Sequence, residues 1–165
     1  IYSKKEIFQQ EGWHYELDEL EGELTYNGVV YNEMKGAFSS PDGILQRESL
    51  NALFPDTPYG VESGGNPDSI PTLSYEDFMA FHNKYYHPSN SYSKLYGNCN
   101  MEERLEWLDK EYLSKFEKIN VDSALKVQFA FEEPRLKVVE YPVTKEQGTA
   151  NKTYISYNVA LPKDL

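Results

Sequence analysis

Hydrophobic residues recur at helical spacing in the second half of the chain. Leu105, Leu108, Tyr112 and Phe116 follow one another at intervals of three or four residues, with charged residues between them. Side chains spaced in this way lie on one face of an α-helix. The pattern therefore predicts a helix over 101–116.

Two further helices are predicted from their start signals. At Ser40-Pro41, a serine that can cap a helix precedes a proline at the first helical position, and apolar residues follow on one broad side. Ser74 and Asp77 form a start similar to a capping box, with Asp in place of Glu or Gln. Pro88 is expected to close this second helix.

Alternating apolar and polar residues predict strands towards both ends of the chain. The strand-like stretches are 13–17, 23–26, 90–96, 126–131, 135–141 and 153–161. The first residues are helical in pattern, and a loop rich in Pro, Gly and Asp occupies 55–71. Helices and strands therefore interleave, which predicts an α+β fold with helices packed on a mostly antiparallel sheet.

The stretch around Asn27-Gly28 allows two interpretations. An Asn-Gly pair between apolar runs is the strongest short hairpin signal, and local sequence leans slightly towards a return strand here. Alternatively, Asn27 caps a helix from about Gly28 to Phe38. In that helix, Glu33 shares a face with Val29, Val30 and Ala37. A carboxylate on an apolar face is costly to bury without a partner, so the second interpretation calls for a cation.

Composition restricts the classes of partner. The 165 residues, enough for one domain or one and a fraction, contain 16 Lys and Arg against 27 Asp and Glu, a net charge of −11. This balance disfavours nucleic acid and suits a basic partner or substrate. No apolar run approaches the roughly 20 residues that span a bilayer, so no membrane partner is expected. Aromatic residues make up 15% of the chain, which argues against disorder.

Few residues are arranged for chemistry. Cys99 is the single cysteine, which excludes an internal disulfide and a zinc site built from several cysteines and makes a reducing compartment the default. His82 and His87 are five residues apart and cannot face one ligand together on a helix, so structural roles are expected. The glycine-rich stretch 60–65 lacks the Lys-Ser/Thr of a phosphate loop and is interpreted as a shaped loop.

Several longer stretches together carry a family resemblance. They are QEGWHYEL, GELTYNGVVYNEMKGAFSSP, LFPDTPYGVESGG, IPTLSYEDFMAFHNKYYHPSNSY and YLSKFE. In this order, over about 9–117, they closely resemble the presequence-protease branch of the pitrilysin/insulinase metallopeptidases. The similarity is looser from Val121 onward. At 97–100 the chain has Gly-Asn-Cys-Asn where the family has Gly-Asp and another acidic residue, away from the metal site.

The resemblance implies a zinc site of the inverzincin type. In that family, HxxEH on one helix supplies two histidines and the general base, and a glutamate on a second helix completes the site. The glutamate of VVYNEMKG, Glu33, matches this third ligand, which implies a helix from about Gly28. HxxEH is expected upstream of Ile1, and an assisting Arg-Tyr pair beyond Leu165. The chain, which starts without Met, is therefore expected to be an internal piece with no catalytic residue of its own.

The same resemblance implies how the chain is divided and what it acts on. Residues 1–117 are expected to form the rear of the catalytic domain, and 118–165 a linker and the first strands of a second, related domain. The implied substrates are unfolded peptides; the residues that contact them are not identified. The implied compartment is the cytoplasm in bacteria and mitochondria or plastids in eukaryotes. Unpaired strand edges predict self-association. The alternative is a non-catalytic scaffold or binding subunit of the same fold.

Overall fold

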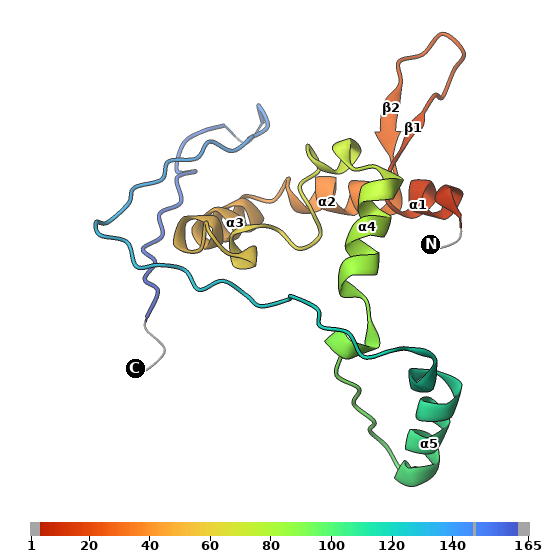
Figure 1. Cartoon of the computed structure of the whole chain (residues 1–165). Helices are drawn as coiled ribbons and strands as arrows, with labels where there is room; N and C mark the ends of the chain where they lie inside the picture. Colours follow the sequence, from red (N-terminus) through yellow and green to blue (C-terminus); the bar gives the residue numbers. More distant parts are fainter. Residues whose placement is uncertain (1–3, 147, 162–165) are drawn as a thin grey trace. The chain divides into compact units, whose positions relative to one another are not determined.

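A computed structural model describes residues 4–146 and 148–161 (Figure 1). The chain forms two compact units. One comprises Ile1–Leu73 together with Leu125–Leu165, and the other comprises Ser74–Ala124. Within the described residues, no helix is both long and apolar enough to cross a bilayer.

The described residues of the first unit form three α-helices, a short hairpin and two 3-10 turns. In chain order these are α1 (Lys5–Glu11), β1 (His14–Glu16), β2 (Thr25–Asn27), α2 (Val29–Ala37), α3 (Pro41–Leu53), η1 (Pro58–Gly60) and η2 (Ile70–Thr72). Strands β1 and β2 are antiparallel, and Tyr15 lies opposite Tyr26 at the middle of the ladder. The hairpin extends away from α1 and α2 (Figure 1).

The second unit consists of two α-helices, each followed by a 3-10 turn. These are α4 (Tyr75–Tyr85), η3 (Pro88–Asn90), α5 (Met101–Glu111) and η4 (Leu113–Lys115). The predicted helix at 101–116 is thus confirmed as α5 plus η4. The two parts of this unit are joined where the Ser89 hydroxyl accepts a hydrogen bond from the Ile119 N–H at 3.1 Å, and the Ser123 hydroxyl donates to Asn90 Oδ1 at 2.6 Å.

The helix-start signals in the sequence are used as predicted. Ser40 caps α3, where its hydroxyl accepts from the Gly43 N–H at 3.3 Å. A full capping box starts α4: the Asp77 N–H donates to the Ser74 hydroxyl at 3.0 Å, and the Ser74 N–H donates to Asp77 Oδ2 at 3.2 Å. Aspartate therefore replaces the usual glutamate here without loss of the reciprocal pair.

The structure decides the question at Asn27-Gly28 in favour of a helix. Strand β2 ends at Asn27, and α2 begins at Val29. The cap position belongs to Gly28, however, and no side chain caps the helix, so the interpretation of Asn27 as the cap was wrong. Gly28 has φ +148°, and a Cβ there would lie 2.4 Å from the Gly12 carbonyl oxygen. Only glycine permits this direct change from strand to helix.

Four of the predicted strands are absent from the described residues. The stretches 90–96, 126–131, 135–141 and 153–161 contain no paired strand. Their alternating pattern predicts a strand only where a neighbouring strand is present to accept its hydrogen bonds, and none lies beside them within the described chain. The α+β class holds, because helices accompany the antiparallel pair β1–β2.

The last segment of the first unit is attached to α3 and to the loop that follows it by polar contacts. Lys137 forms an ion pair with Glu48, and its Nζ donates to Asn51 Oδ1 at 2.7 Å. Gln128 Nε2 donates to the Asp56 carboxylate at 2.8 Å. These are side-chain contacts, so the backbone groups of the segment are not used in them.

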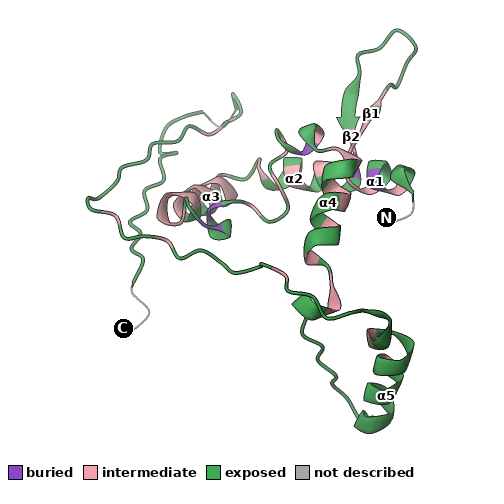
Figure 2. Cartoon of the chain, in the orientation of Figure 1, coloured by how far each residue is buried: buried purple, intermediate pink, exposed green. Residues whose placement is uncertain are grey.

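Few residues are buried. Among the described residues, the buried hydrophobic side chains are Phe8 and Ile70, which are 9% and 5% exposed (Figure 2). Buried polar and glycine positions add Thr57, Gly28 and Gly60. All five lie in the first unit, around α1, the start of α2 and the loop 54–70. Burial among the described residues of this unit is therefore concentrated around α1, the start of α2 and the loop 54–70.

Candidate functional site

Glu33 lies on α2, on a helical face that is apolar and exposed. Val29, four residues before it, is 48% exposed, and Val30, three residues before it, is 36% exposed. Glu33 and Ala37 are also exposed. The helix expected from the family resemblance is confirmed, while the role of Glu33 stays a prediction. A carboxylate is costly to bury without a partner, and on this exposed face Glu33 stays accessible to solvent.

The start of α2 is fixed to the hairpin through Asn27. Its side-chain oxygen accepts from the Gly28 N–H at 2.7 Å and from Asn32 Nδ2 at 2.6 Å. Its Nδ2 donates to a carboxylate oxygen of Glu16, on β1, at 2.7 Å. The Tyr31 N–H also donates to the Gly12 carbonyl at 3.2 Å. One amide side chain thus ties strand and helix together and sets the direction of the face that carries Glu33.

The other end of α2 is held by α3. The Arg47 guanidinium donates to the Ala37 carbonyl at 3.2 Å, which satisfies an oxygen that the helix itself leaves without a partner. It also lies 3.8 Å from the centre of the Phe38 ring. A positive charge at this end additionally favours the helix dipole.

The glycine-rich loop packs against the middle of α2. A Cβ at Gly64 would lie 2.3 Å from the sulfur of Met34, the residue after Glu33. Gly65 has φ +95°, a conformation that side-chain-bearing residues rarely adopt. The interpretation of 60–65 as a shaped loop agrees with this contact, and the loop provides a support for the helix.

A single donor of this kind does not complete a metal site. Within the described ranges, no group of three or more His, Cys, Asp or Glu side chains is arranged to hold a metal ion. A catalytic zinc site uses three protein ligands and a water, and carboxylate oxygen is an accepted ligand type. The chemistry of Glu33 therefore fits one zinc ligand, and the described residues supply no complete set beside it.

The histidines have structural positions. His14 contacts the Gln9 carbonyl through Nδ1 at 2.9 Å, and the His82 ring stacks on Tyr86 with 4.6 Å between centroids. His87 caps η3, where its Nδ1 accepts from the Ser89 N–H at 3.1 Å. The contacts of His82 and His87 agree with the structural roles expected from their spacing.

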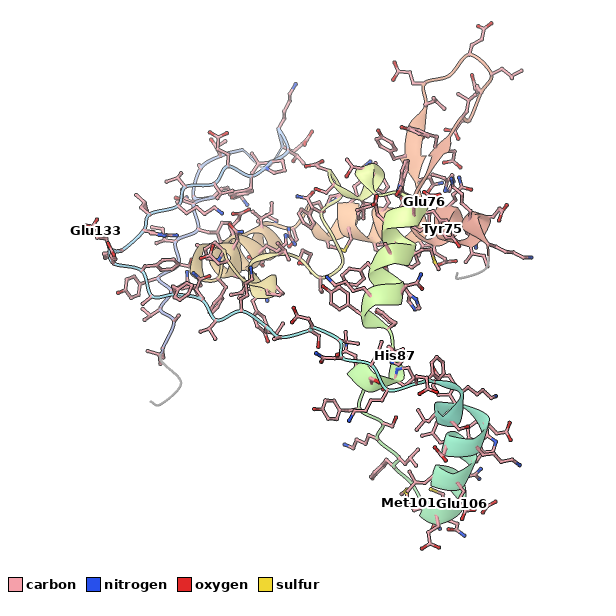
Figure 3. The ribbon with its side chains drawn as sticks, in the orientation of Figure 1. Tyr75, Glu76, His87, Met101, Glu106 and Glu133 are labelled. Atoms are coloured by element: carbon pink, nitrogen blue, oxygen red, sulfur yellow. The ribbon has the colours of Figure 1, made fainter. Side chains whose placement is uncertain are left out.

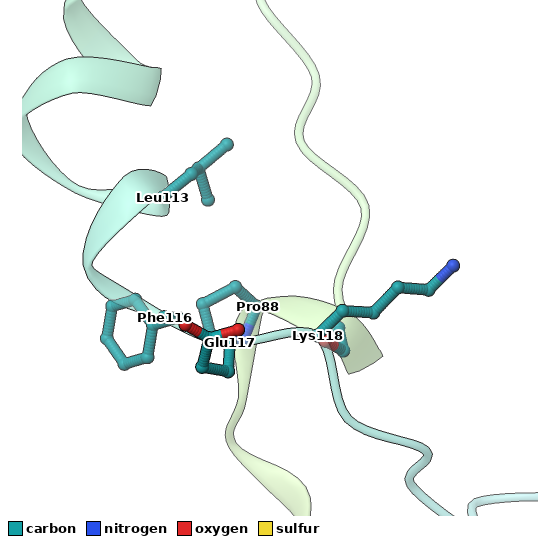
Figure 4. A pocket seen from close by; sticks show the side chains of 6 residues that line it. Pro88, Leu113, Phe116, Glu117 and Lys118 are labelled. Atoms are coloured by element: carbon teal, nitrogen blue, oxygen red, sulfur yellow. The ribbon is translucent and has the colours of Figure 1, made fainter.

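Other acidic residues and the single cysteine lie apart from α2 in the chain. Glu102, Glu103, Glu106, Glu132, Glu133 and Cys99 are exposed. Figure 3 labels Glu106 on α5 and Glu133 on the last segment. A cavity of about 290 Å³ is lined by Pro88, Ser89, Leu113, Phe116, Glu117 and Lys118 (Figure 4). No residue of α2 lines this cavity.

Sequence reasoning missed the residues that position α2. Asn27 was considered as a cap, whereas its side chain joins three partners at the strand-to-helix junction. Arg47 and Gly64 carried no local signal, because their partners Ala37 and Met34 lie ten and thirty residues away along the chain. An Asn-Gly pair directly before an apolar helical pattern was the one hint available.

Comparisons with known proteins show which family the sequence matches. The family profile described as "Peptidase M16 inactive domain" matches residues 72–164. Protein HypA of Clostridium perfringens is 52% identical over 161 residues, which are 98% of this chain and 16% of HypA. Presequence protease 1, chloroplastic/mitochondrial, of Arabidopsis thaliana is 44% identical, covering 96% of this chain and 15% of that protein.

A mouse protein extends the similarity to animals. Presequence protease, mitochondrial, of Mus musculus is 38% identical over 94% of this chain and 15% of its own length. The chain thus spans about one sixth of the length of the curated relatives it matches. The profile match covers more than half of the chain, and the similar relatives extend over nearly all of it. The chain therefore belongs to the peptidase M16 family.

Proposed function

We propose that this chain is part of a zinc-dependent endopeptidase that degrades unfolded peptides, and that Glu33 is one of the three protein ligands of its zinc ion. The observation that carries this proposal is the position of Glu33 on an exposed apolar helical face. Within the described chain, no ion pair neutralises that carboxylate. Similarity to proteins named presequence protease supports the same assignment.

The chain's own contribution is to hold one oxygen ligand in a fixed direction. Asn27 fixes the start of α2, and Arg47 fixes its end, so the Glu33 carboxylate needs little reorganisation to bind a cation. When bound, zinc supplies a Lewis acid and lowers the pKa of a bound water towards about 7. The two histidine ligands and the general base are proposed to come from HxxEH elsewhere in the longer protein.

Unfolded peptides are the proposed substrates, since the names of the relatives refer to presequences. The net charge of −11 favours positively charged peptides over nucleic acid. Relatives named for mitochondria and chloroplasts, and a bacterial one, support the cytoplasm in a bacterial host and mitochondria or plastids in a eukaryotic one. Residues 1–117 are proposed as the rear of the catalytic domain and 118–165 as the start of the second domain.

The proposal is tested by changing Glu33 in the full-length protein. Glu33→Gln keeps the size of the side chain and removes the anionic oxygen. We expect zinc affinity, measured by competition with a chromogenic chelator, to fall by more than the roughly 10–100-fold typical of losing an outer-shell partner. Peptidase activity falls with it. The matched control is Glu6→Gln on α1, an equally exposed carboxylate that should leave both quantities unchanged.

The isolated 165-residue chain provides a second arm of this test. One carboxylate without its histidines should bind zinc weakly, and the chain should be inactive. Tight one-to-one zinc binding in a calorimetric titration of this chain would contradict the proposed division of the ligands. Unchanged zinc affinity in full-length Glu33→Gln would contradict the ligand assignment itself.

The description of the matched profile favours one alternative, a non-catalytic subunit of the same fold. That profile is named for an inactive domain and covers 72–164. Glu33 lies outside this range, which is why the peptidase is preferred. A full-length protein that contains no zinc when purified, and whose stability is unaffected by Glu33→Gln, would favour the scaffold.

A further inference from the structure

One face of the β1–β2 hairpin is apolar and uncovered. Tyr15 and Tyr26 lie opposite each other, with ring centroids 5.3 Å apart, and are 58% and 43% exposed. Beyond the paired residues, Leu17 directly follows β1 and Leu24 directly precedes β2; they are 45% and 64% exposed. Leu20, at the tip, is 98% exposed. A short hairpin with so many exposed apolar residues is marginally stable by itself and normally has a partner.

The apolar face continues from the hairpin into α2. The Trp13 ring lies 5.5 Å from Tyr15 and 5.9 Å from Tyr26, and Tyr26 lies 5.9 Å from Tyr31. We call Trp13, Tyr15, Tyr26 and Tyr31 the aromatic row. Tyr31 belongs to the first turn of α2, two residues before Glu33. A chain lying along the row would thus reach the helix that carries the proposed zinc ligand.

The same hairpin is strongly negative. No lysine or arginine occurs between Lys5 and Lys35, while Asp18, Glu19, Glu21 and Glu23 occupy the connection between the strands. All four are exposed. Because the carboxylates flank exposed leucines and tyrosines, the surface is complementary to a segment that carries both positive charges and apolar side chains. Tyrosine rings add a favourable contact for arginine.

We propose that this hairpin face, made of the aromatic row with Leu17, Leu20 and Leu24 and the four carboxylates, binds a positively charged amphipathic segment of the peptide substrate. A second copy of the chain is disfavoured as the occupant, because its hairpin carries the same negative charge. The inference rests on the proposed function for its link to Glu33, and it adds to that function a binding surface outside the metal site.

The experiment measures peptide binding to the full-length protein with zinc removed by a chelator, so that no cleavage interferes. The probe is a fluorescein-labelled amphipathic peptide of about 16 residues that contains arginine and leucine and no acidic residue. The control peptide has the same sequence with glutamate in place of each arginine. The hairpin variant is Asp18→Asn/Glu19→Gln/Glu21→Gln/Glu23→Gln. The charge-matched control is Glu102→Gln/Glu103→Gln/Glu106→Gln/Asp109→Asn on α5.

For the hairpin variant we expect the Kd of the arginine peptide, measured by fluorescence anisotropy, to rise roughly tenfold at low salt and less than about twofold at about 0.5 M salt, where charges are screened. The control variant should change Kd less than about twofold at either salt concentration. Tyr15→Ser/Tyr26→Ser should weaken binding at both salt concentrations, because an apolar contact is not screened. The glutamate peptide should bind weakly throughout.

Equal effects of the hairpin and control variants would show that only overall charge matters and would overturn the proposal. So would an unchanged Kd in the hairpin variant. If that variant does not fold, a peptide with a benzophenone side chain is photocrosslinked to the unaltered protein, and crosslinks outside 13–31 would overturn it. Because binding is measured without zinc, a failed ligand role for Glu33 and a failed hairpin site give different results.

Discussion

Gly28 joins β2 to α2, and its conformation determines where the face with Glu33 points. A side chain at this position would contact the Gly12 carbonyl oxygen at 2.4 Å and the Trp13 Cα at 2.7 Å. We expect Gly28→Ala to destabilise the protein by about 1–3 kcal/mol from backbone strain alone, with the clash adding to it. The measurement is the urea midpoint of unfolding of the full-length protein.

Alanine substitutions at two other glycines distinguish backbone strain from steric clash as the cause of destabilisation. Gly97 has φ +135°, and a Cβ added there would meet no atom within 4 Å, so Gly97→Ala reports strain without a clash. Gly36 lies within α2 with open space around it, so Gly36→Ala should be neutral or slightly stabilising. If Gly28→Ala unfolds at the same urea concentration as Gly97→Ala, the close approach to Gly12 has no energetic consequence.

The role of individual residues could be predicted only where the sequence carries a complete signal. Glu33 became the proposed zinc ligand through a long run of residues that resemble the family, whereas its local sequence alone favoured no such role. The junction at Asn27 was undecided, since its Asn-Gly pair fits a hairpin turn and a strand-to-helix turn equally well. Its three hydrogen bonds depend on the placement of Glu16 and Asn32, which one local stretch does not determine.

At the scale of the elements, the capping box that begins α4 contains a titratable group, the carboxyl of Asp77. Hydrogen bonds from the Ser74 side chain and backbone hold the pKa of Asp77 below its ordinary value of 3.8. A carboxyl with a depressed pKa in the folded state stabilises above its unfolded pKa and loses that contribution as pH falls through the folded one. We therefore expect α4 to lose protection as the pH is lowered below about 4.

Hydrogen exchange of the α4 amides, corrected for intrinsic rates, measures this loss. Asp77→Asn is the matched variant, because it keeps Glu76 in the same first turn and removes only the titrating group. The unaltered protein should lose protection as the pH falls below about 4, and the variant should change much less over the same interval. Identical pH profiles for the two proteins would mean that Asp77 does not stabilise the helix.

Helices were predicted better than strands for a physical reason. The start signals of α3 and α4 act within four residues, so the sequence contains both partners of each cap. A strand is completed by another strand. The stretches at 126–131 and 153–161 have the alternating pattern, but no ladder forms in the described part of the chain. The alternating pattern shows that these segments can form strands, but it does not specify the partner strand that each would need.

At the scale of the whole molecule, the last described segment, 125–161, has exposed apolar side chains and strand-like stretches that no other strand pairs with in the described chain. Exposed apolar residues alternate along it: Phe129, Val138 and Ile155 are 83%, 82% and 91% exposed. It is held to α3 through the side chain of Lys137 and to Asp56 through that of Gln128. The carbonyls of Phe129 and Lys152 accept side-chain hydrogen bonds, and no strand ladder uses the segment's backbone groups within the described residues. Edges of this kind add strands readily, so we expect the isolated 165-residue chain to self-associate in a concentration-dependent way.

Sedimentation velocity tests this expectation with two charge-matched variants. Phe129→Lys/Val138→Lys/Ile155→Lys places charges on the alternating face and should give a monomer, because lysines on an edge oppose strand addition. Tyr59→Lys/Val61→Lys/Leu73→Lys changes exposed positions outside the segment by the same charge and should leave self-association intact. If both variants become monomeric, association depends on charge or general apolar exposure. A monomer already in the unaltered chain at all concentrations would mean that these backbone groups are satisfied within one molecule, and the argument from unpaired edges would be wrong.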